Sequence, residues 1–363
     1  MRLIRNKLIK YIYRQIKGLP KAYIPRPDFP TKNLSLNKTL LITCSSWFNQ
    51  EQQTAGTLMR EGFARGWAEV CGPAKLIPTI NICQEIDNYE KPAIFMSEFE
   101  FNDLSFTEIK KLRDIDLFVW VGTHPRKLAK LEKETLIDKS EIEISLNSYA
   151  KIMFAEPKFV WNAYGEAARE WYQGWIDDGL KWETIYPAVD TSRYYPEIKL
   201  KKYGHISMAY VGGYWEEKAQ AFEKYLRPWE NVLYTFGYTD WPYENYSGRL
   251  TPSEERQLYS SVGMVPLVTT PAGNMLAEIT ERYLKAPACK AFCIADENPA
   301  LREIFNKDEM IQAENAEHFQ ELVKDYLNGK IDIDAWKENG YKAVQERHLY
   351  KHRALQIKNM LDV

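Results

Sequence analysis

Short apolar runs alternate with helix-compatible segments along this chain, and the alternation starts twice. In the first half the runs are residues 39–45, 74–80, 93–96, 117–121, 159–162 and 185–188. In the second half they are residues 206–211, 231–236, 264–268 and 288–295. Strands that are separated by helices in this way are typical of a parallel sheet with helices on both of its faces. The sequence therefore predicts an α/β protein with two Rossmann-like domains facing each other across a cleft.

A charged segment that contains proline, residues 187–204, separates the two halves and predicts a hinge. We expect a basic helix and a linker at 1–37, a first domain at 38–190 and a second domain at 191–340. A C-terminal helix over 341–361 carries an apolar stripe far from any strand of its own. The stripe predicts that residues 341–363 cross back and complete the first domain.

One segment of the second half, residues 279–305, combines a helix, a buried strand and a second helix start. Pro287 is expected to end the first helix, and residues 288–295 are expected to form the strand. Cys289 and Cys293 then lie on one face of that strand as small core residues. The chain has five cysteines, an odd number, mostly within apolar runs, which favours reduced thiols and a cytoplasmic location.

The overall charge excludes some partners. The formal net charge of the 363 residues is -2, so nucleic acid is not an expected partner. No run of about 18 apolar residues occurs, and we expect no membrane-spanning helix.

Residues 2–21 differ from the rest of the chain because they contain seven Lys or Arg residues and no acidic residue. Ile4, Leu8, Ile12 and Ile16 recur every four residues, which predicts an amphipathic basic helix. Such a helix binds the surface of an anionic membrane, here the inner face, or packs on the domain with its basic side in water. Both interpretations stay open.

Ligands of open α/β sheets bind at the carboxyl ends of the strands. In the second half three loops follow such ends: Gly212–Gly213, Gly237 and residues 269–274, with Thr270, Gly273 and Asn274. Glycines let backbone amides approach a phosphate, although a tight turn explains a glycine pair equally well. The small polar loop at 269–274 is a plausible nest for a diphosphate.

In the first half, His124 and Glu98 follow predicted strands at the same edge. His124 is placed to orient an acceptor, or it is a structural residue. Glu98 is a candidate base for an inverting reaction, whereas a retaining reaction needs no strong base. Asp114-Ile115-Asp116 precedes its strand and Asp332-Ile333-Asp334 begins a helix, so neither is expected to hold a metal, and no cofactor is expected.

Several segments, in order over residues 159–357, resemble those of GT-B glycosyltransferases, especially the spore-coat CgeB-like branch of the group 1 enzymes. They are YPAVDTSRYYP, MAYVGGYWEEKAQAFEKYL, YTFGYTDW, YSGRLTPSEERQLYSSVGMVPL, ITERYLKAPACKAFCIADENPALREIF and ERHLYKHRALQI. The resemblance implies a metal-independent hexosyl- or pentosyltransferase of polysaccharide biosynthesis. Its partners would be a nucleotide-sugar donor and a glycan or lipid-linked acceptor. Lys218 and Arg282 match the family's candidates for binding the donor phosphates.

One departure from the family's pattern affects the donor site. The family's helix Glu falls on Lys285, and its Gly after Cys falls on Lys290. Glu281, one turn before Lys285, either takes over the ribose contact or forms an i,i+4 ion pair with Lys285. The departure keeps two alternatives open: a sugar-nucleotide epimerase of the same fold, and a catalytically lapsed protein that binds a glycan or a partner.

Overall fold

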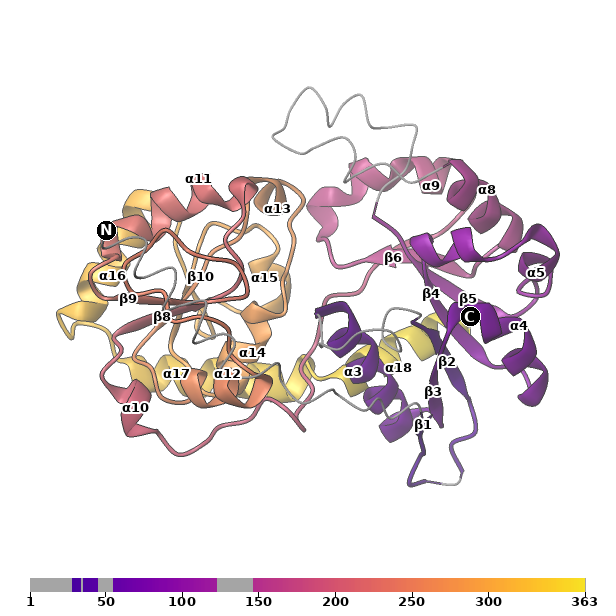
Figure 1. Ribbon diagram of the computed structural model, residues 1–363, viewed down its shortest axis with the longest axis horizontal. Helices are drawn as coiled ribbons and strands as arrows, with labels where there is room; N and C mark the ends of the chain where they lie inside the picture. Colours follow the sequence, from indigo (N-terminus) through magenta and orange to yellow (C-terminus); the bar gives the residue numbers. More distant parts are fainter. Residues whose placement is uncertain (1–27, 34, 45–54, 123–145, 363) are drawn as a thin grey trace, which may run out of the picture.

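The computed structural model describes residues 28–33, 35–44, 55–122 and 146–362, which form two α/β domains (Figure 1). Residues 2–21 and His124 lie outside the described residues. Among the described helices, none has both the length and the apolar character needed to cross a bilayer.

The first domain contains a seven-stranded sheet in the order β1-β3-β2-β4-β5-β6-β7. Its strands are β1 (Asp28–Phe29), β2 (Leu40–Thr43), β3 (Ala74–Ile77), β4 (Ala93–Ser97), β5 (Asp116–Trp120), β6 (Phe159–Asn162) and β7 (Trp182–Thr184). All neighbouring pairs are parallel except β1 and β3. Every residue of β2, β4 and β6 is buried because helices cover both faces of the sheet. The expected last strand at 185–188 is wrong: the strand is β7, which ends at Thr184.

The helices of the first domain come from both ends of the chain. They are α3 (Ala55–Val70), α4 (Ile82–Glu85), α5 (Phe106–Lys110), α8 (Leu146–Ala155), α9 (Gln173–Asp177) and the C-terminal α18 (Tyr350–Leu361), together with the 3-10 turns η1 (Thr79–Asn81), η2 (Ile86–Asn88), η3 (Glu98–Asp103) and η5 (Glu166–Tyr172). Helix α18 packs on α3, where Tyr350 lies directly on Gly62 and Gly66. The two glycines let the helices approach closely, and the end of the chain thereby covers the sheet of the first domain (Figure 1).

The second domain contains parallel strands in two groups, β8-β9 and β10-β11-β12. The strands are β8 (Met208–Val211), β9 (Leu233–Phe236), β10 (Val265–Leu267), β11 (Cys293–Ala295) and β12 (Ile311–Gln312). A bridge between Met208 and Met264 joins the two groups. The helices are α10 (Lys201–Gly204), α11 (Glu216–Tyr225), the 3-10 turn η6 (Arg227–Trp229), α12 (Pro252–Tyr259), α13 (Pro271–Met275), α14 (Arg282–Ala288), α15 (Leu301–Ile304), α16 (Ala316–Leu327) and α17 (Ile333–Arg347).

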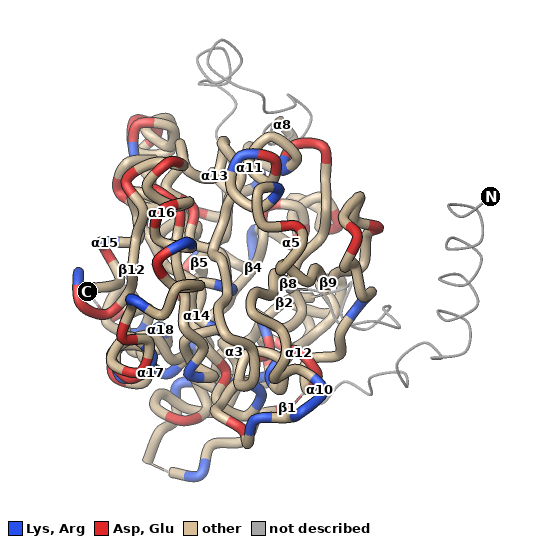
Figure 2. Tube along the Cα trace, turned by 90° about the vertical axis from the view of Figure 1, so that its left-hand side faces the viewer, with Lys and Arg blue, Asp and Glu red and all other residues tan. Residues whose placement is uncertain are grey.

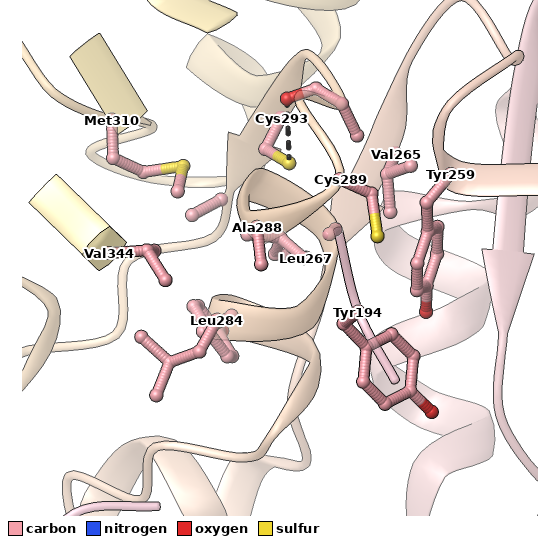
Figure 3. Packing of buried hydrophobic residues seen from close by; sticks show 14 of the residues in the cluster. Tyr194, Tyr259, Val265, Leu267, Leu284, Ala288, Cys289, Cys293, Met310 and Val344 are labelled. Carbon is pink, nitrogen blue, oxygen red and sulfur yellow. Dashed lines mark hydrogen bonds between the residues drawn. The ribbon is translucent and has the colours of Figure 1, made fainter. Parts of the chain in front are cut away.

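Helix α14 corrects the sequence interpretation of residues 279–305. Pro287 lies inside this helix, and the strand begins only at Cys293. The helix continues through the proline because it packs against α17, where the position of a Cβ on Gly340 lies 3.5 Å from Pro287. Cys289 and Cys293 therefore do not share a strand. Figure 3 shows Cys289 near Tyr259, whereas Cys293 lies farther from that ring, at the start of β11.

The end of the chain passes from one domain to the other at His348–Leu349. The single helix predicted over 341–361 is wrong, because α17 ends at Arg347 and α18 begins at Tyr350. Leu349 has an extended backbone and forms a bridge with Val189 of the segment between the domains. Two chain segments thus connect the domains, side by side.

Candidate functional site

The glycine loops that follow β8 and β9 pack against each other. A Cβ on Gly237 would lie 2.1 Å from the carbonyl oxygen of Gly212, and the indole nitrogen of Trp241 donates to that oxygen at 2.9 Å. Gly212, Gly213 and Gly237 do not have left-handed φ angles, which occur at other glycines of the chain. These three positions therefore require glycine because a side chain would not fit, and not because of their backbone conformation. These contacts bring the carboxyl ends of β8 and β9 together.

Arg282, the first residue of α14, lies beneath these loops. Its Nε donates to the carbonyl oxygen of Val211 at 2.7 Å, and its guanidinium lies 4.3 Å from the centroid of the Tyr210 ring. A terminal nitrogen of Arg282 is 2.6 Å from the position of a Cβ on Gly212. The missing side chain of Gly212 therefore makes room for the guanidinium at the end of β8.

Two further charged groups interact with Arg282. Lys218 lies in the first turn of α11, and burial together with the cation of Arg282 lowers its pKa to about 8. Burial raises the pKa of Glu278, although the nearby cations of Lys218 and Arg282 oppose that shift. The three groups carry more positive than negative charge, which favours an anion at this edge of the sheet.

The loop after β10 is organised from within. The Thr270 hydroxyl accepts a hydrogen bond from the Gly273 amide at 2.8 Å and caps α13. The buried carboxylate of Asp296, after β11, accepts from the Thr269 amide at 2.8 Å and from the Asn274 side chain at 3.5 Å. Burial raises the pKa of Asp296 to about 6, and these donors partly offset that rise. The predicted loop residues therefore hold the loop in shape at the carboxyl end of β10.

Glu281 and Lys285 form the i,i+4 ion pair that is one of the two sequence interpretations. The ammonium of Lys285 lies 5.0 Å from the centroid of the Tyr194 ring, in the segment between the domains. Burial lowers the pKa of Lys285, but the carboxylates of Glu281 and Glu255 outweigh burial and raise it. Lys285 is thus held as a cation beside the hinge.

In the first domain Glu98 lies at the carboxyl end of β4. Its side chain is 3 % exposed and accepts a hydrogen bond from the amide of Gly122 at 2.8 Å, just after β5. Burial raises the pKa of Glu98 to about 7, although the Gly122 amide lowers it. Tyr164, which follows β6, has its pKa raised by burial and by the carboxylates of Glu278 and Glu98. The hydroxyl of Tyr164 therefore interacts electrostatically with one carboxylate from each domain.

Backbone hydrogen bonds join the two domains next to Tyr164 and Glu278. Tyr164 and Glu278 form an antiparallel bridge, and the amide of Gly165 donates to the carbonyl of Ala277 at 2.8 Å. Ala277 adopts a left-handed φ of 53°, which is unfavourable for a residue with a Cβ. This bond anchors the chain immediately before Glu278, so the carboxylate stands where the domains meet.

The Asp-x-Asp motifs lie away from this place. Asp116 begins β5, at the opposite edge of the sheet, and pairs with Lys38. Asp332 caps α17 by accepting from the amide of Ala335, as the sequence predicts. Among the described residues, no three His, Cys, Asp or Glu side chains form a group suited to a metal ion.

The structure thus brings Lys218 and Arg282 together with the glycine loops, and it places Glu98 at the facing edge of the first domain. Sequence reasoning missed Glu278 and Tyr164. The sequence position of Glu278, a carboxylate between the loop at 269–274 and the helix of Arg282, could have identified it. Tyr164 could have been identified because it follows a predicted strand at the ligand-binding edge of the sheet.

Known structures share this two-domain arrangement. Sucrose-phosphate synthase from Thermosynechococcus elongatus superposes with a TM-score of 0.59 and 9% sequence identity, over 90% of this chain and 98% of that one. Anabaena Alr3699/HepE in complex with UDP-glucose superposes with a TM-score of 0.56 and 11% identity, over 89% and 99% of the two chains. The fold is GT-B.

The sequence match is confined to the second half of this GT-B protein. Residues 198–359 match the model of a family described as glycosyl transferase-like. No curated protein matches the chain in sequence. The matched region contains the glycine loops, Lys218, Glu278 and Arg282, and it reaches into α18. It therefore covers the whole second-domain part of the candidate site.

Proposed function

We propose that the protein is a glycosyltransferase that moves a sugar from a nucleotide-sugar donor to an acceptor. The gathering of Lys218 and Arg282 beneath the glycine loops, at the carboxyl ends of β8 and β10, carries this proposal. The GT-B fold and the family match over 198–359 support it. HepE was solved with UDP-glucose, which makes a nucleoside diphosphate sugar the natural first probe.

The two cations would bind the diphosphate of the donor. When the bond to the sugar breaks, negative charge grows on the leaving diphosphate, and fixed cations stabilise that charge. Lys218 has a pKa of about 8 and is mainly protonated at neutral pH. A bound anion would raise its pKa further, so binding and protonation favour each other. We propose that this charge replaces a divalent metal.

Glu98 would act on the acceptor in an inverting reaction. A carboxylate with a pKa of about 7 accepts a proton near neutral pH far better than an ordinary glutamate. Glu98 lies at the edge of the first domain, and burial together with its carboxylate and that of Glu278 raises the pKa of Tyr164. His124, which follows β5, remains a candidate for orienting the acceptor.

We extend the proposal to a hexosyl- or pentosyltransferase of polysaccharide biosynthesis in the CgeB-like branch, working in the cytoplasm. The acceptor would be a glycan or a lipid-linked saccharide, and residues 2–21 would hold the enzyme on an anionic membrane. Co-sedimentation with anionic vesicles at low and high salt, with the full chain and with a chain starting at Lys32, tests this membrane contact. Equal binding by both chains would contradict it.

The donor proposal is tested by binding and by turnover. Titration with UDP, GDP, dTDP and CMP sugars should find one donor whose affinity falls in Lys218→Ala and Arg282→Ala by about 1–3 kcal/mol each. Incubation with that donor should release nucleotide, by hydrolysis or by transfer. Tight binding without turnover, with or without acceptors, would favour a catalytically lapsed binder. Conversion of the donor sugar without release would favour an epimerase.

A further inference from the structure

Two aromatic side chains are exposed at the rim of the glycine loops. Trp215 precedes α11 and is 40% exposed, and Tyr238 follows Gly237 and is 59% exposed. Their ring centroids lie 5.3 Å apart, and the ring planes meet at 63°. Large apolar surfaces that face water next to a binding site commonly mark a contact with a ligand.

The loops hold these rings in place. The indole nitrogen of Trp215 lies 2.9 Å from the position of a Cβ on Gly213, so the missing side chain lets the ring lie against the backbone. The Thr239 hydroxyl, next to Tyr238, accepts a hydrogen bond from the Tyr214 amide at 2.5 Å and ties the two loops together. These contacts hold the two loops that carry the rings, which lowers the entropy cost of stacking a ligand on them.

The position of the two aromatic rings relative to Lys218 indicates what kind of ligand would stack on them. Lys218 follows Trp215 by three residues, so the two are about one helical turn apart at the start of α11. A nucleotide carries a flat aromatic base and a phosphate group in one molecule. A ring platform one turn away from a phosphate-binding cation fits that combination.

We propose that Trp215 and Tyr238 form the platform on which the base of the donor nucleotide stacks. This inference rests on the proposed function, because it needs the diphosphate to lie on Lys218 and Arg282. Trp215 supplies the stacking face, and Tyr238 closes one side of the platform at the observed angle. Stacking tolerates every base, so the platform contributes affinity for nucleotides more than choice among them.

The experiment compares two probes that share the phosphates and differ in the base. The full chain is titrated calorimetrically with the tightest of UDP, GDP and dTDP, and with inorganic pyrophosphate. Trp215→Ala should bind the nucleotide about tenfold more weakly and pyrophosphate as the wild type does. Trp215→Phe should keep most of the nucleotide affinity. Phe106→Ala, which removes an exposed ring of the first domain, is the matched control and should change neither.

The outcomes separate this inference from the proposed function. Lys218→Ala should weaken the binding of both probes, whatever the role of Trp215. Unchanged nucleotide affinity in Trp215→Ala, with the loss retained in Lys218→Ala, would overturn the platform and leave the donor site standing. An equal loss for pyrophosphate and nucleotide in Trp215→Ala would also overturn it, because it would indicate a disturbed phosphate site. A wild type that binds none of the probes would overturn both.

Discussion

Tyr164 of the first domain and Glu278 of the second pair their backbones in an antiparallel bridge at the junction of the two domains. The pairing holds the backbone of Glu278 where the two domains meet, and each domain contributes a different part of the site. Burial raises the pKa of Glu278 while the cations of Lys218 and Arg282 lower it, and burial together with the carboxylate of Glu278 raises the pKa of Tyr164. Charge at Glu278 therefore affects how strongly the second domain attracts an anion.

Replacing this carboxylate should tighten the binding of phosphate. Glu278→Gln removes one negative charge beside two cations, and we expect pyrophosphate to bind about fivefold more tightly, or roughly 1 kcal/mol. Glu297→Gln is the control, since Glu297 follows β11 and pairs with Tyr225. Unchanged pyrophosphate affinity in Glu278→Gln would place the carboxylate away from the phosphates.

The rate of transfer should depend on pH through Glu98. A general base must be deprotonated, so kcat/KM should decline as the pH falls below about 7, where this carboxyl takes up a proton. Glu98→Gln should remove this part of the profile and lower the rate by about 100-fold or more. The measurement is kcat/KM from pH 5 to 9. A profile that keeps the same limb in the variant would assign it to another group.

The same carboxyl should make the fold less stable as the pH rises. Its pKa is raised in the folded protein, so the native state binds more protons than the unfolded state between about pH 4.5 and 7. The contribution of Glu98 is most favourable below the unfolded pKa and is lost as the pH rises through the folded pKa. Urea unfolding should show that Glu98→Gln gains stability relative to wild type between pH 5 and pH 8. An equal difference at both pH values would contradict the raised pKa.

The crossing of α18 onto α3 depends on a glycine. A Cβ on Gly66 would lie 2.4 Å from the backbone carbon of Tyr350, which cannot move without shifting the start of α18. Gly66→Ala should therefore destabilise the protein by about 3 kcal/mol, at the upper end of typical overpacking. Gly204→Ala is the matched control because nothing lies within 4 Å of its added Cβ. Thermal unfolding of both variants measures the difference, and similar melting temperatures would refute the tight packing.

The periodicity of the chain predicted most of the fold and only part of the site. Buried strands such as β4 and β6 are continuous apolar runs, so their places could be read from the residues alone. Lys218 and Arg282 were found because they match the candidates of the resembling family for binding the donor phosphates. Glu278 was missed because its role depends on three segments that meet only in the folded protein.

The errors have physical reasons as well. Pro287 was expected to end its helix, but packing against α17 outweighs the hydrogen bond that proline lacks. The C-terminal helix was expected to be continuous, but the chain must cross between domains, and it does so through the extended residue Leu349. Tertiary contacts decided both cases, and neither contact is visible in local sequence patterns.

Lys290 stands where the resembling family has glycine, and its backbone explains that preference. Its φ is 57°, and the amide of Ala291 donates to the carbonyl of Ala286 at 3.1 Å, which closes the end of α14. A left-handed residue at this position is usually glycine, because a Cβ is unfavourable there. Lys290 tolerates the position while its ammonium binds Glu338 at 2.6 Å.

Two substitutions separate the cost of the left-handed backbone at Lys290 from the contribution of its ion pair. Both Lys290→Ala and Lys290→Gly remove the pair with Glu338, but only glycine relieves the left-handed backbone. Lys290→Gly should therefore be more stable than Lys290→Ala by about 1 kcal/mol in urea unfolding. Ala288→Gly, in the helical part of α14, should destabilise by a similar amount or more, since glycine lowers helix stability there. If Lys290→Gly is no more stable than Lys290→Ala, the left-handed backbone does not limit the stability of this helix end. The glycine of the resembling family would then need an explanation other than the helix cap.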